Sequence, residues 1–249
     1  MDLAYEAKYH QLEEQHWWFT SRRNTVFDLV QRMNLPLDTR ILEIGCSGGP
    51  LQFMLRKAGF QHVTGIDVSE PAIALAKHRG LTDVHLMDGA HLEFPDASFD
   101  LVIASDVLEH IENDAQATRE WARVLRPGGQ MVVFVPAFQQ LWSQHDVVNH
   151  HFRRYTGKDL RQVLEAARLH VSRVSFWNMA LVFPTALMRM VQRRLTPPTK
   201  PTDGGGDLHG LPGPLNNLLS LWLRGENALL RRLNFPVGVS VFAVAQKKA

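Results

Sequence analysis

The sequence predicts an α/β fold in which a mostly parallel sheet lies between layers of helices. Short apolar runs alternate with helical patterns along the first half of the 249-residue chain. Strand–helix alternation of this kind favours parallel strands joined by right-handed crossovers. A glycine-rich turn, residues 45–49, joins the first apolar run to the helix that follows it. The length suits one sizeable domain with additions at its flanks.

The individual elements follow in chain order. Residues 2–16 and 21–34 have helical patterns ahead of the first strand. Strands are expected near 40–44, 62–66, 83–87, 100–104 and 130–135, alternating with helices near 49–59, 70–79 and 114–125. Pro50 and Pro71 stand at favourable positions for helix starts. The run RPGGQ, residues 126–130, predicts a stop and a turn before the fifth strand.

Two further apolar runs, RVSFW and VSVFAVAQ, are expected to form the last two strands. Between them lies an insertion, residues 178–237, with two leucine-rich helical patterns joined by a Pro- and Gly-rich linker. Its seven basic residues outnumber its three acidic ones. We expect a single domain, with a helical cap at 1–37, a core at 38–177 and 238–249, and the insertion as a helical addition or lid.

The turn within ILEIGCSGG, residues 41–49, indicates where a ligand binds. Glycines there let the backbone pass close to a ligand, because no Cβ intervenes. A dinucleotide loop needs G-x-G-x-x-G, but counting from Gly45 places Ser47 and Pro50 at the next two glycine positions. Glu43 also puts a carboxylate where phosphates would lie. The loop therefore suits a ligand with a cation and a nucleoside but no phosphate.

Acidic residues follow the next strands at their carboxyl ends. Asp67 comes 22 residues after Gly45, close to the ~20 expected for an acid that binds ribose hydroxyls. Asp88 could accept a hydrogen bond from an exocyclic amine, and Asp106 ends the fourth run. Each also has a structural alternative: a turn residue for Asp67, a helix N-cap for Asp88 and a solvated loop acid for Asp106.

The segments LEIGCSGG, TGIDVSEPAIALAK, LMDGAHLEFPDASFDLVIASDVLEHI and ARVLRPGGQMVVFVP resemble the successive motifs of class I, Rossmann-like S-adenosylmethionine-dependent methyltransferases. The resemblance covers roughly residues 38–136. It implies a three-layer αβα fold with a mostly parallel seven-stranded sheet and an antiparallel last strand. It also implies S-adenosyl-L-methionine as the cofactor. One departure is Ser47, which replaces the middle glycine of the family and fits if its φ is negative.

The resemblance assigns a role to each strand end. Glu43, Gly45 and Cys46 would line the methionine moiety, and Asp67 would bind the ribose diol. The remaining positions would contact the adenine and the methyl-transfer pocket; they are Val68, Asp88, Gly89, Ser105 and Asp106.

The segment HWWFTSRR, residues 16–23, carries three aromatics followed by two arginines. Part of it could cap the cofactor, with Arg22 or Arg23 pairing with the methionine carboxylate and Trp18 facing the acceptor. Alternatively, Trp17 and Trp18 pack this helix onto the core.

Histidines and arginines cluster after the fifth strand, in VPAFQQLWSQHDVVNHHFRRYTGKDL. Methyl transfer to a hydroxyl or amine benefits from a positioned base; the candidates are His110, His145 and His151. Arg153, Arg154 and Tyr155 are the expected substrate-binding residues, because guanidinium groups match carboxylate or phosphate. Alternatively, His110 holds its loop, and HFRRYT caps the helix that starts near Lys158. We expect no metal, since transfer from a sulfonium does not require one.

Composition limits the remaining classes. The single cysteine, Cys46, excludes an internal disulfide. The amino terminus lacks the apolar core of a signal peptide, and no run is long enough to span a bilayer, so we expect a cytoplasmic protein. Nucleic acid is not an expected partner, because no dense basic stripe is present. The insertion could be a lid, a homodimer face or a peripheral contact with the inner membrane surface.

These observations predict methyl transfer to a small-molecule or lipid-linked acceptor, on oxygen. Two alternatives stay open. One is another nucleoside-using enzyme, such as a dehydrogenase. The other is a catalytically silent relative that acts as a membrane-associated partner in a biosynthetic assembly.

Overall fold

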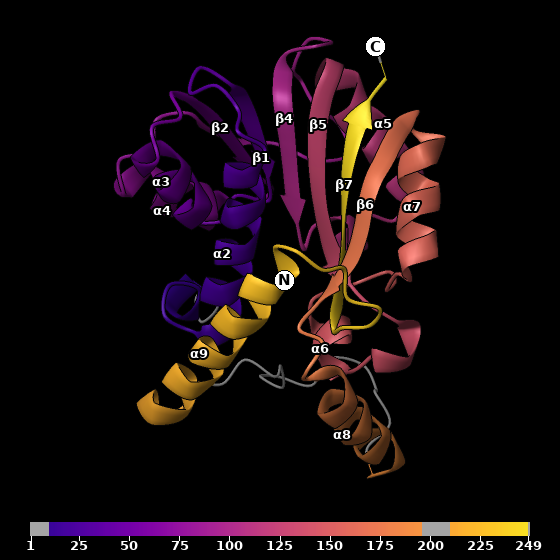
Figure 1. The fold of residues 1–249 in the computed structure, drawn as a ribbon. Coiled ribbons are helices and arrows are strands. Elements are labelled where there is room, and N and C mark those ends of the chain that lie inside the picture. The colour runs from indigo at the N-terminus through magenta and orange to yellow at the C-terminus, as the bar shows by residue number, and fades with distance from the viewer. Residues whose placement is uncertain (1–9, 196–209, 249) are drawn as a thin grey trace.

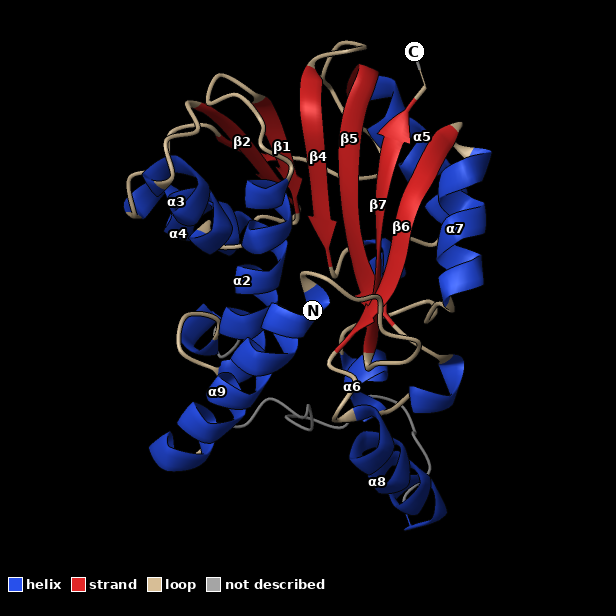
Figure 2. Cartoon of the chain, in the orientation of Figure 1, coloured by secondary structure: helices blue, strands red, loops and turns tan. Residues whose placement is uncertain are grey.

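The computed structural model describes residues 10–195 and 210–248. A seven-stranded sheet in the order β3-β2-β1-β4-β5-β7-β6 runs through its centre, with helices on both faces (Figures 1 and 2). Neighbouring strands from β3 to β5 are parallel, whereas β7 is antiparallel to both β5 and β6. The predicted fold class is confirmed, including the antiparallel pairing of the last two strands.

The strands are β1 (Arg40–Ile44), β2 (His62–Asp67), β3 (Val84–Leu86), β4 (Phe99–Ser105), β5 (Leu125–Pro136), β6 (Leu169–Trp177) and β7 (Ser240–Lys247). The helices are α2 (Trp17–Arg32), α3 (Pro50–Lys57), α4 (Glu70–His78), α5 (Asp114–Val124), α6 (Gln144–Val148), α7 (Gly157–Ala166), α8 (Val182–Leu195) and α9 (Gly213–Leu230). Two 3-10 turns, η1 (Leu108–His110) and η2 (Gln139–Leu141), follow β4 and β5.

The two faces of the sheet build two hydrophobic clusters. Along β4, Val102 packs with α5 and α7, while Ile103 packs with α2, α3 and α9 on the opposite face. Successive side chains of a strand point to opposite faces, so a strand covered on both sides is apolar throughout. This explains the unbroken apolar run of β4, which holds the polar carboxyl ends of the strands in fixed positions.

Two predicted boundaries were wrong. The second helix begins at Trp17 rather than residue 21, because the ring of His16 caps it by accepting a hydrogen bond from the Trp18 amide (3.4 Å). The RPGGQ turn does not precede the fifth strand but forms a bulge inside β5. There Leu125 pairs with Phe99 and Gln130 pairs with Leu101, so the intervening residues loop out, with Gly128 at φ +78°. Of the predicted first helix, residues 2–9 lie outside the described part of the chain.

The insertion after β6 supplies α8 and α9, which lie at the end of the molecule where the parallel strands finish (Figure 1). One face of α9 packs on α2, with Leu223 and Leu230 buried against Val26 and Val30. The Asn227 amide donates to the Ser21 carbonyl (3.3 Å), which fixes the same face. None of the described helices combines the length and apolar content that a membrane crossing requires.

Candidate active site

The carboxyl ends of β1, β2 and β4 bring three loops together at one edge of the sheet. Ile44 pairs with Ile66 on one side and with Ala104 on the other, so the residues that follow these three positions are neighbours. Ligands of open α/β sheets bind outside the carboxyl ends of the strands. This edge is therefore the candidate site.

The glycine loop after β1 is shaped by left-handed backbone. Gly45 has φ +74°, and a Cβ placed on it would lie 2.4 Å from Cγ2 of Val107. The amides of Gly45 and Cys46 both donate to the Ile66 carbonyl (2.9 and 3.0 Å), which fastens the loop to β2. The condition stated for a serine at this position, a negative φ, is not met: the φ of Ser47 is +50°. The family glycine at this position has a backbone reason, since L-residues adopt this region at a cost.

Two carboxylates face the loop. Asp67 accepts from the Ser47 amide through Oδ2 (2.9 Å) and from the Ser69 amide through Oδ1 (3.0 Å). Glu43 is buried, and burial followed by the charge of Asp67 raises the pKa of its carboxyl well above the ordinary value. Among the described residues, Oε2 of Glu43 has no hydrogen-bond partner. A buried carboxyl oxygen without a hydrogen-bond partner favours the binding of a cationic ligand that can donate to it. The sequence predicted a cationic ligand for this loop.

The adenine-side residues lie beside the loop. Val68 is 71% exposed, which leaves an apolar surface directly after Asp67. Asp88 is exposed, and its side chain accepts from the Ala90 amide (2.8 Å). Gly89 is buried, and a Cβ on it would lie 2.8 Å from Cγ2 of Ile44. Burial, and next the charge of Glu43, raises the pKa of the Cys46 thiol, so this thiol is inert.

Asp106 follows the last residue of β4 and has a left-handed conformation, with φ +58°. Oδ1 of Asp106 lies 3.6 Å from a terminal nitrogen of Arg22, and its Oδ2 accepts from the Ser105 hydroxyl (3.3 Å). The Arg22 guanidinium is buried, donates to the Ser240 hydroxyl, and lies 4.3 Å from the ring centre of Trp177. Arg22 thus reaches Asp106 from α2, and its role in cofactor binding stays a prediction.

Trp18 packs its ring edge-on against Trp177, with ring centres 4.8 Å apart. Both tryptophans belong to the cluster between α2 and the sheet. The geometry favours the packing alternative for Trp18 over its predicted role in acceptor binding.

The residues between β5 and α7 form a closed loop over the same edge. The Phe138 amide donates to the Tyr155 carbonyl, and the Tyr155 amide donates to the Pro136 carbonyl (both 3.0 Å). The Phe152 amide donates to the Glu109 carbonyl (2.8 Å), which fastens this loop to η1. As a result the rings of His110 and His151 meet edge to face, with centres 4.5 Å apart.

His151 is held by a buried carboxylate. Its Nδ1 lies 2.8 Å from Oδ1 of Asp146, and Arg154 donates to both oxygens of that carboxylate (2.8 and 3.0 Å). Burial alone would raise the pKa of Asp146, but the hydrogen bond from His151 and the charge of Arg154 hold it well below its ordinary value. Asp146 is therefore a permanent anion that orients the His151 ring.

His110 and His145 differ from His151. Burial is the main cause that lowers the pKa of His110 to about 3, and its electrostatic interaction with the neighbouring His151 is the next. A ring with so low a pKa accepts a proton poorly, which disfavours His110, the first candidate from the sequence, as the general base. His145 contacts Asn149, and its ring centre lies 5.9 Å from that of His151.

The side chains of the predicted arginine clamp have partners within the protein, and their role in substrate binding stays a prediction. Arg154 is committed to Asp146, and the buried Tyr155 hydroxyl donates to Asp114 Oδ2 (2.9 Å). Arg153 pairs with the same Asp114 oxygen (2.8 Å) and donates to the Glu112 carbonyl. Thr156 caps α7 in a capping box with Asp159, as in the structural alternative for this segment. These side chains hold the loop through acidic partners, of which Asp146 and Asp159 are near in sequence and Asp114 is 41 residues from Tyr155.

Glu109 is a site residue that the sequence analysis did not single out. It is buried, and burial followed by the charge of Asp106 raises the pKa of its carboxyl well above the ordinary value. Donor atoms of Glu109, His110 and His151 lie within 4.8 Å of one another, close enough to hold a metal ion together. The expectation of no metal stays a prediction. The signal in the sequence was the acid adjacent to His110 at the end of the fourth strand.

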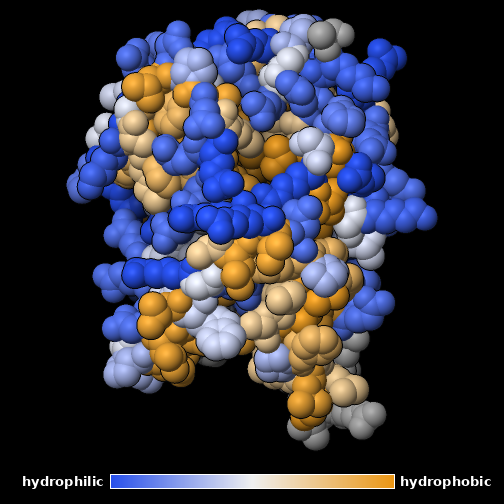
Figure 3. All heavy atoms as spheres, in the orientation of Figure 1, coloured by the Kyte–Doolittle hydropathy of each residue, from blue (hydrophilic) through white to orange (hydrophobic). Residues whose placement is uncertain are grey.

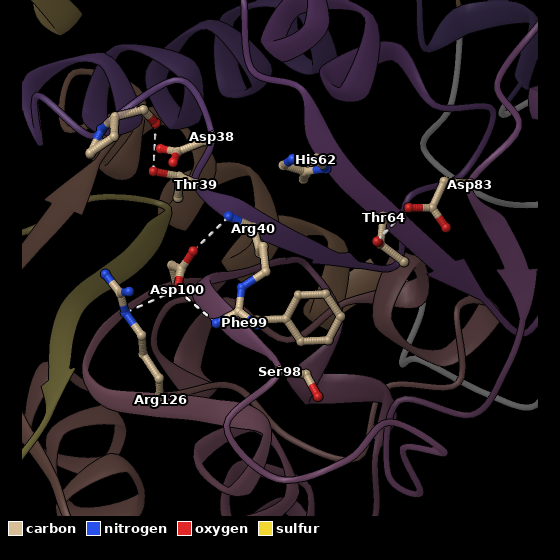
Figure 4. Close-up of a pocket in the computed structure, with 11 residues that line it drawn as sticks. Asp38, Thr39, Arg40, His62, Thr64, Asp83, Ser98, Phe99, Asp100 and Arg126 are labelled. Carbon is tan, nitrogen blue, oxygen red and sulfur yellow. Dashed lines mark hydrogen bonds and ion pairs between the residues drawn. The ribbon is translucent and has the colours of Figure 1, made fainter.

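A separate depression lies at the opposite edge of the sheet (Figure 4). Its volume is about 650 Å³, and it is lined by residues at the amino ends of β1, β2 and β4. Three of its charged residues lie together: Asp100 accepts from the Arg40 amide (2.7 Å) and lies 2.9 Å from Nε of Arg126. The predicted functional residues are all elsewhere, so this depression is not the candidate site.

Comparison with known proteins gives matches to methyltransferases. Residues 42–133 match a family model described as a methyltransferase domain. The methyltransferase GfsG of Streptomyces halstedii is 35% identical over 113 residues, 42% of this chain and 40% of that protein. The ubiquinone biosynthesis O-methyltransferase of Aromatoleum aromaticum is 32% identical over 149 residues, 52% of this chain and 61% of that protein. The chain thus spans less than two thirds of these relatives.

Solved structures show the same fold across nearly the whole chain. A methyltransferase in complex with the Trm112 methyltransferase activator of Haloferax volcanii is 19% identical, with a TM-score of 0.65 over 99% of this chain and 95% of that one. Phosphoethanolamine N-methyltransferase 2 of Haemonchus contortus, solved with S-adenosyl-L-methionine, is 18% identical, with a TM-score of 0.59 over 91% of this chain and 53% of that one.

Proposed function

We propose that this chain, a class I S-adenosylmethionine-dependent methyltransferase by domain match and fold, methylates an oxygen atom of a small-molecule or lipid-linked acceptor. The observation that carries the proposal is the convergence of two arrangements at one edge of the sheet. An acidic glycine loop suits the cofactor, and a carboxylate-held histidine suits a hydroxyl acceptor.

S-adenosyl-L-methionine supplies a methyl group that is already electrophilic. The partnerless Oε2 of buried Glu43 fits the cationic methionine end, and Asp67, at the end of β2, fits the ribose hydroxyls. Val68 offers its exposed apolar side chain to the adenine. Arg22 would bind the methionine carboxylate; its guanidinium lies 3.6 Å from Asp106, which follows the carboxyl end of β4.

His151 is the residue that we propose as the general base. A hydroxyl acceptor must lose a proton as its oxygen attacks the methyl carbon, and a positioned base contributes roughly 10²–10⁴-fold. Nδ1 of His151 is hydrogen-bonded to Asp146, so the proton from the acceptor hydroxyl is transferred to Nε2. The anionic Asp146 stabilises the imidazolium that forms, and Arg154 holds Asp146 in place. The site must also align the acceptor oxygen with the methyl group, and such alignment can lower the activation barrier by ~7–11 kcal/mol.

The exposed faces of α8 and α9 support an acceptor that is carried by a lipid. Apolar side chains gather over both helices at the edge where the site lies (Figure 3). More than half of each of these side chains is exposed: Phe183, Leu187, Leu218, Leu221, Trp222 and Leu229. Arg224 and Arg232 are exposed, and the one acid of the two helices, Glu226, is buried. Apolar and basic side chains together favour an anionic bilayer surface. We therefore propose peripheral contact with the inner membrane surface.

The test is transfer of isotopically labelled methyl from S-adenosyl-L-methionine to cell extract, separated into aqueous and lipid fractions. Label should enter a compound whose new bond is an O-methyl ether or ester, as identified by mass spectrometry. Label on nitrogen or carbon would contradict the assignment to oxygen. Cofactor binding without any labelled product would favour the catalytically silent alternative.

A further inference from the structure

A buried glutamate from the amino-terminal segment is hydrogen-bonded to the glycine loop. The side chain of Glu13 is only 4% exposed, and its Oε2 accepts a hydrogen bond from the Ser47 hydroxyl (2.7 Å). We propose that Glu13 is a positioning residue for the cofactor loop, and that residues 10–16 form a strap that must lift for the cofactor to exchange. This inference rests on the proposed cofactor site.

The contacts of Glu13 join three parts of the chain. Arg79, at the end of α4, lies 3.3 Å from Glu13 Oε1 and donates to the Gly48 carbonyl (3.0 Å). Arg23, from α2, donates to the Glu13 backbone carbonyl (3.0 Å). The strap, the loop and α4 therefore meet at one carboxylate. A shift of Glu13 would separate the strap from the loop and leave Arg79 bonded to the Gly48 carbonyl.

Ser47 explains why the contact exists. Its φ of +50° is a conformation that glycine adopts freely and that serine adopts at a cost. A glycine here would lack the hydroxyl that binds Glu13, and Nδ1 of His10 also lies 3.2 Å from that hydroxyl. The hydrogen bonds to the strap offset the strained backbone, so the serine has a use that the family glycine cannot supply.

The position of Glu13 couples the strap to the cofactor. The carboxylates of Asp67 and Glu13 repel a negative charge on Glu43. Their charges, together with burial, raise the pKa of the Glu43 carboxyl. A cation bound there relieves the repulsion among the three acids. Binding of the cofactor should then hold the strap closed, and a closed strap should slow cofactor release by the same coupling.

The experiment measures release of S-adenosylhomocysteine from the full chain by stopped flow. Hydrogen bonds to charged groups contribute ~1.5–3 kcal/mol, so Ser47→Ala and Glu13→Gln should each raise the release rate about tenfold or more. The matched control is Glu14→Gln, because exposed Glu14 pairs with the same arginine (2.5 Å) and makes no contact with Ser47 among the interactions described. Its release rate should stay within about twofold of the parent, since exposed ion pairs contribute little.

Two further readouts separate positioning from general damage. In a double-mutant cycle, Ser47→Ala and Glu13→Gln together should raise the release rate by less than the product of their separate effects, because they share the contact between Ser47 and Glu13. Hydrogen exchange of residues 10–16 should slow when S-adenosylhomocysteine binds the parent and not when it binds Glu13→Gln. Unchanged release rates, or additive free-energy effects of the two substitutions, would contradict the proposal for the strap and leave the proposed function standing. Failure of the parent chain to bind would overturn the proposed function as well.

Discussion

Nδ1 of His151 lies 2.8 Å from Oδ1 of Asp146, on the carboxylate that also receives two hydrogen bonds from Arg154. All three side chains are buried to more than nine tenths. The arrangement fixes the orientation of the imidazole and supplies a compensating charge when the ring takes a proton. It distinguishes His151 from His110, whose low pKa, about 3, results chiefly from burial.

Replacement of Asp146 by asparagine should lower the turnover number about 10²–10⁴-fold, the range for loss of a working base. His151→Ala should produce a loss of the same size. The dissociation constant of the cofactor, measured by calorimetry, should change little, since neither residue lies at the glycine loop. A loss of cofactor affinity that matched the loss of turnover would assign the pair to binding instead.

Asp146→Asn should also destabilise the fold. Breaking a buried ion pair costs about 3–5 kcal/mol, because Arg154 is left buried without its partner. The folded-state pKa of Asp146 is depressed, so its stabilisation is present above the unfolded value of about 3.9 and is lost as pH falls toward the folded value. Urea unfolding of the two proteins should converge at acid pH.

Glu43→Gln should stabilise the ligand-free protein at pH 7–8 and weaken the binding of the cofactor. The folded-state pKa of Glu43 is raised, chiefly by burial, so its carboxyl opposes folding above the unfolded value. The cofactor should bind about tenfold or more weakly, because a hydrogen bond to a charged group contributes ~1.5–3 kcal/mol.

Exposed Glu93 offers a matched control. Glu93→Gln should change neither the free energy of unfolding nor the calorimetric affinity. If Glu43→Gln bound the cofactor as tightly as the parent, the assignment of Glu43 to the methionine end would be wrong.

His110→Asn should flatten the dependence of stability on pH between 7 and 5. The unfolded ring takes up a proton near pH 6.5, whereas the folded ring stays neutral until about pH 3. The unfolded state therefore binds more protons in this window, and the parent loses stability as pH falls. Urea midpoints at several pH values would check this. Equal slopes for both proteins would contradict a neutral, buried His110.

Leu221→Glu and Trp222→Glu should each weaken binding to vesicles of anionic lipid by about tenfold or more, since burying such a side chain is worth ~1.5–3 kcal/mol. These residues are 65% and 59% exposed on α9. Leu37, which is 51% exposed and precedes β1, gives the control Leu37→Glu, for which sedimentation with vesicles should not change. Absence of vesicle binding by the parent, together with concentration-dependent dimers, would assign the face to a second copy of the chain.

The alternation of apolar runs and helical patterns was sufficient to predict the parallel sheet and the edge at which its acids gather. Parallel strands of successive units end at the same edge, so the sequence pattern alone places Glu43, Asp67 and Asp106 together. Helix ends were less certain at Trp17, where a histidine cap is a weaker signal than Ser, Thr, Asp or Asn. The bulge in β5 was missed because Pro and Gly usually mark a turn between elements.

The sequence by itself determined the parallel fold and the place of the ligand loop, because these depend on local periodicity and on spacing along the chain. The class of chemistry was implied by the resemblance of its motifs to those of class I methyltransferases. Only the tertiary structure decided the partner of each charged side chain. Arg154 turns to Asp146 rather than to an acceptor, and Glu13 reaches Ser47 across 34 residues. Burial strengthens such pairings by removing water, and burial depends on packing that no single segment of sequence contains.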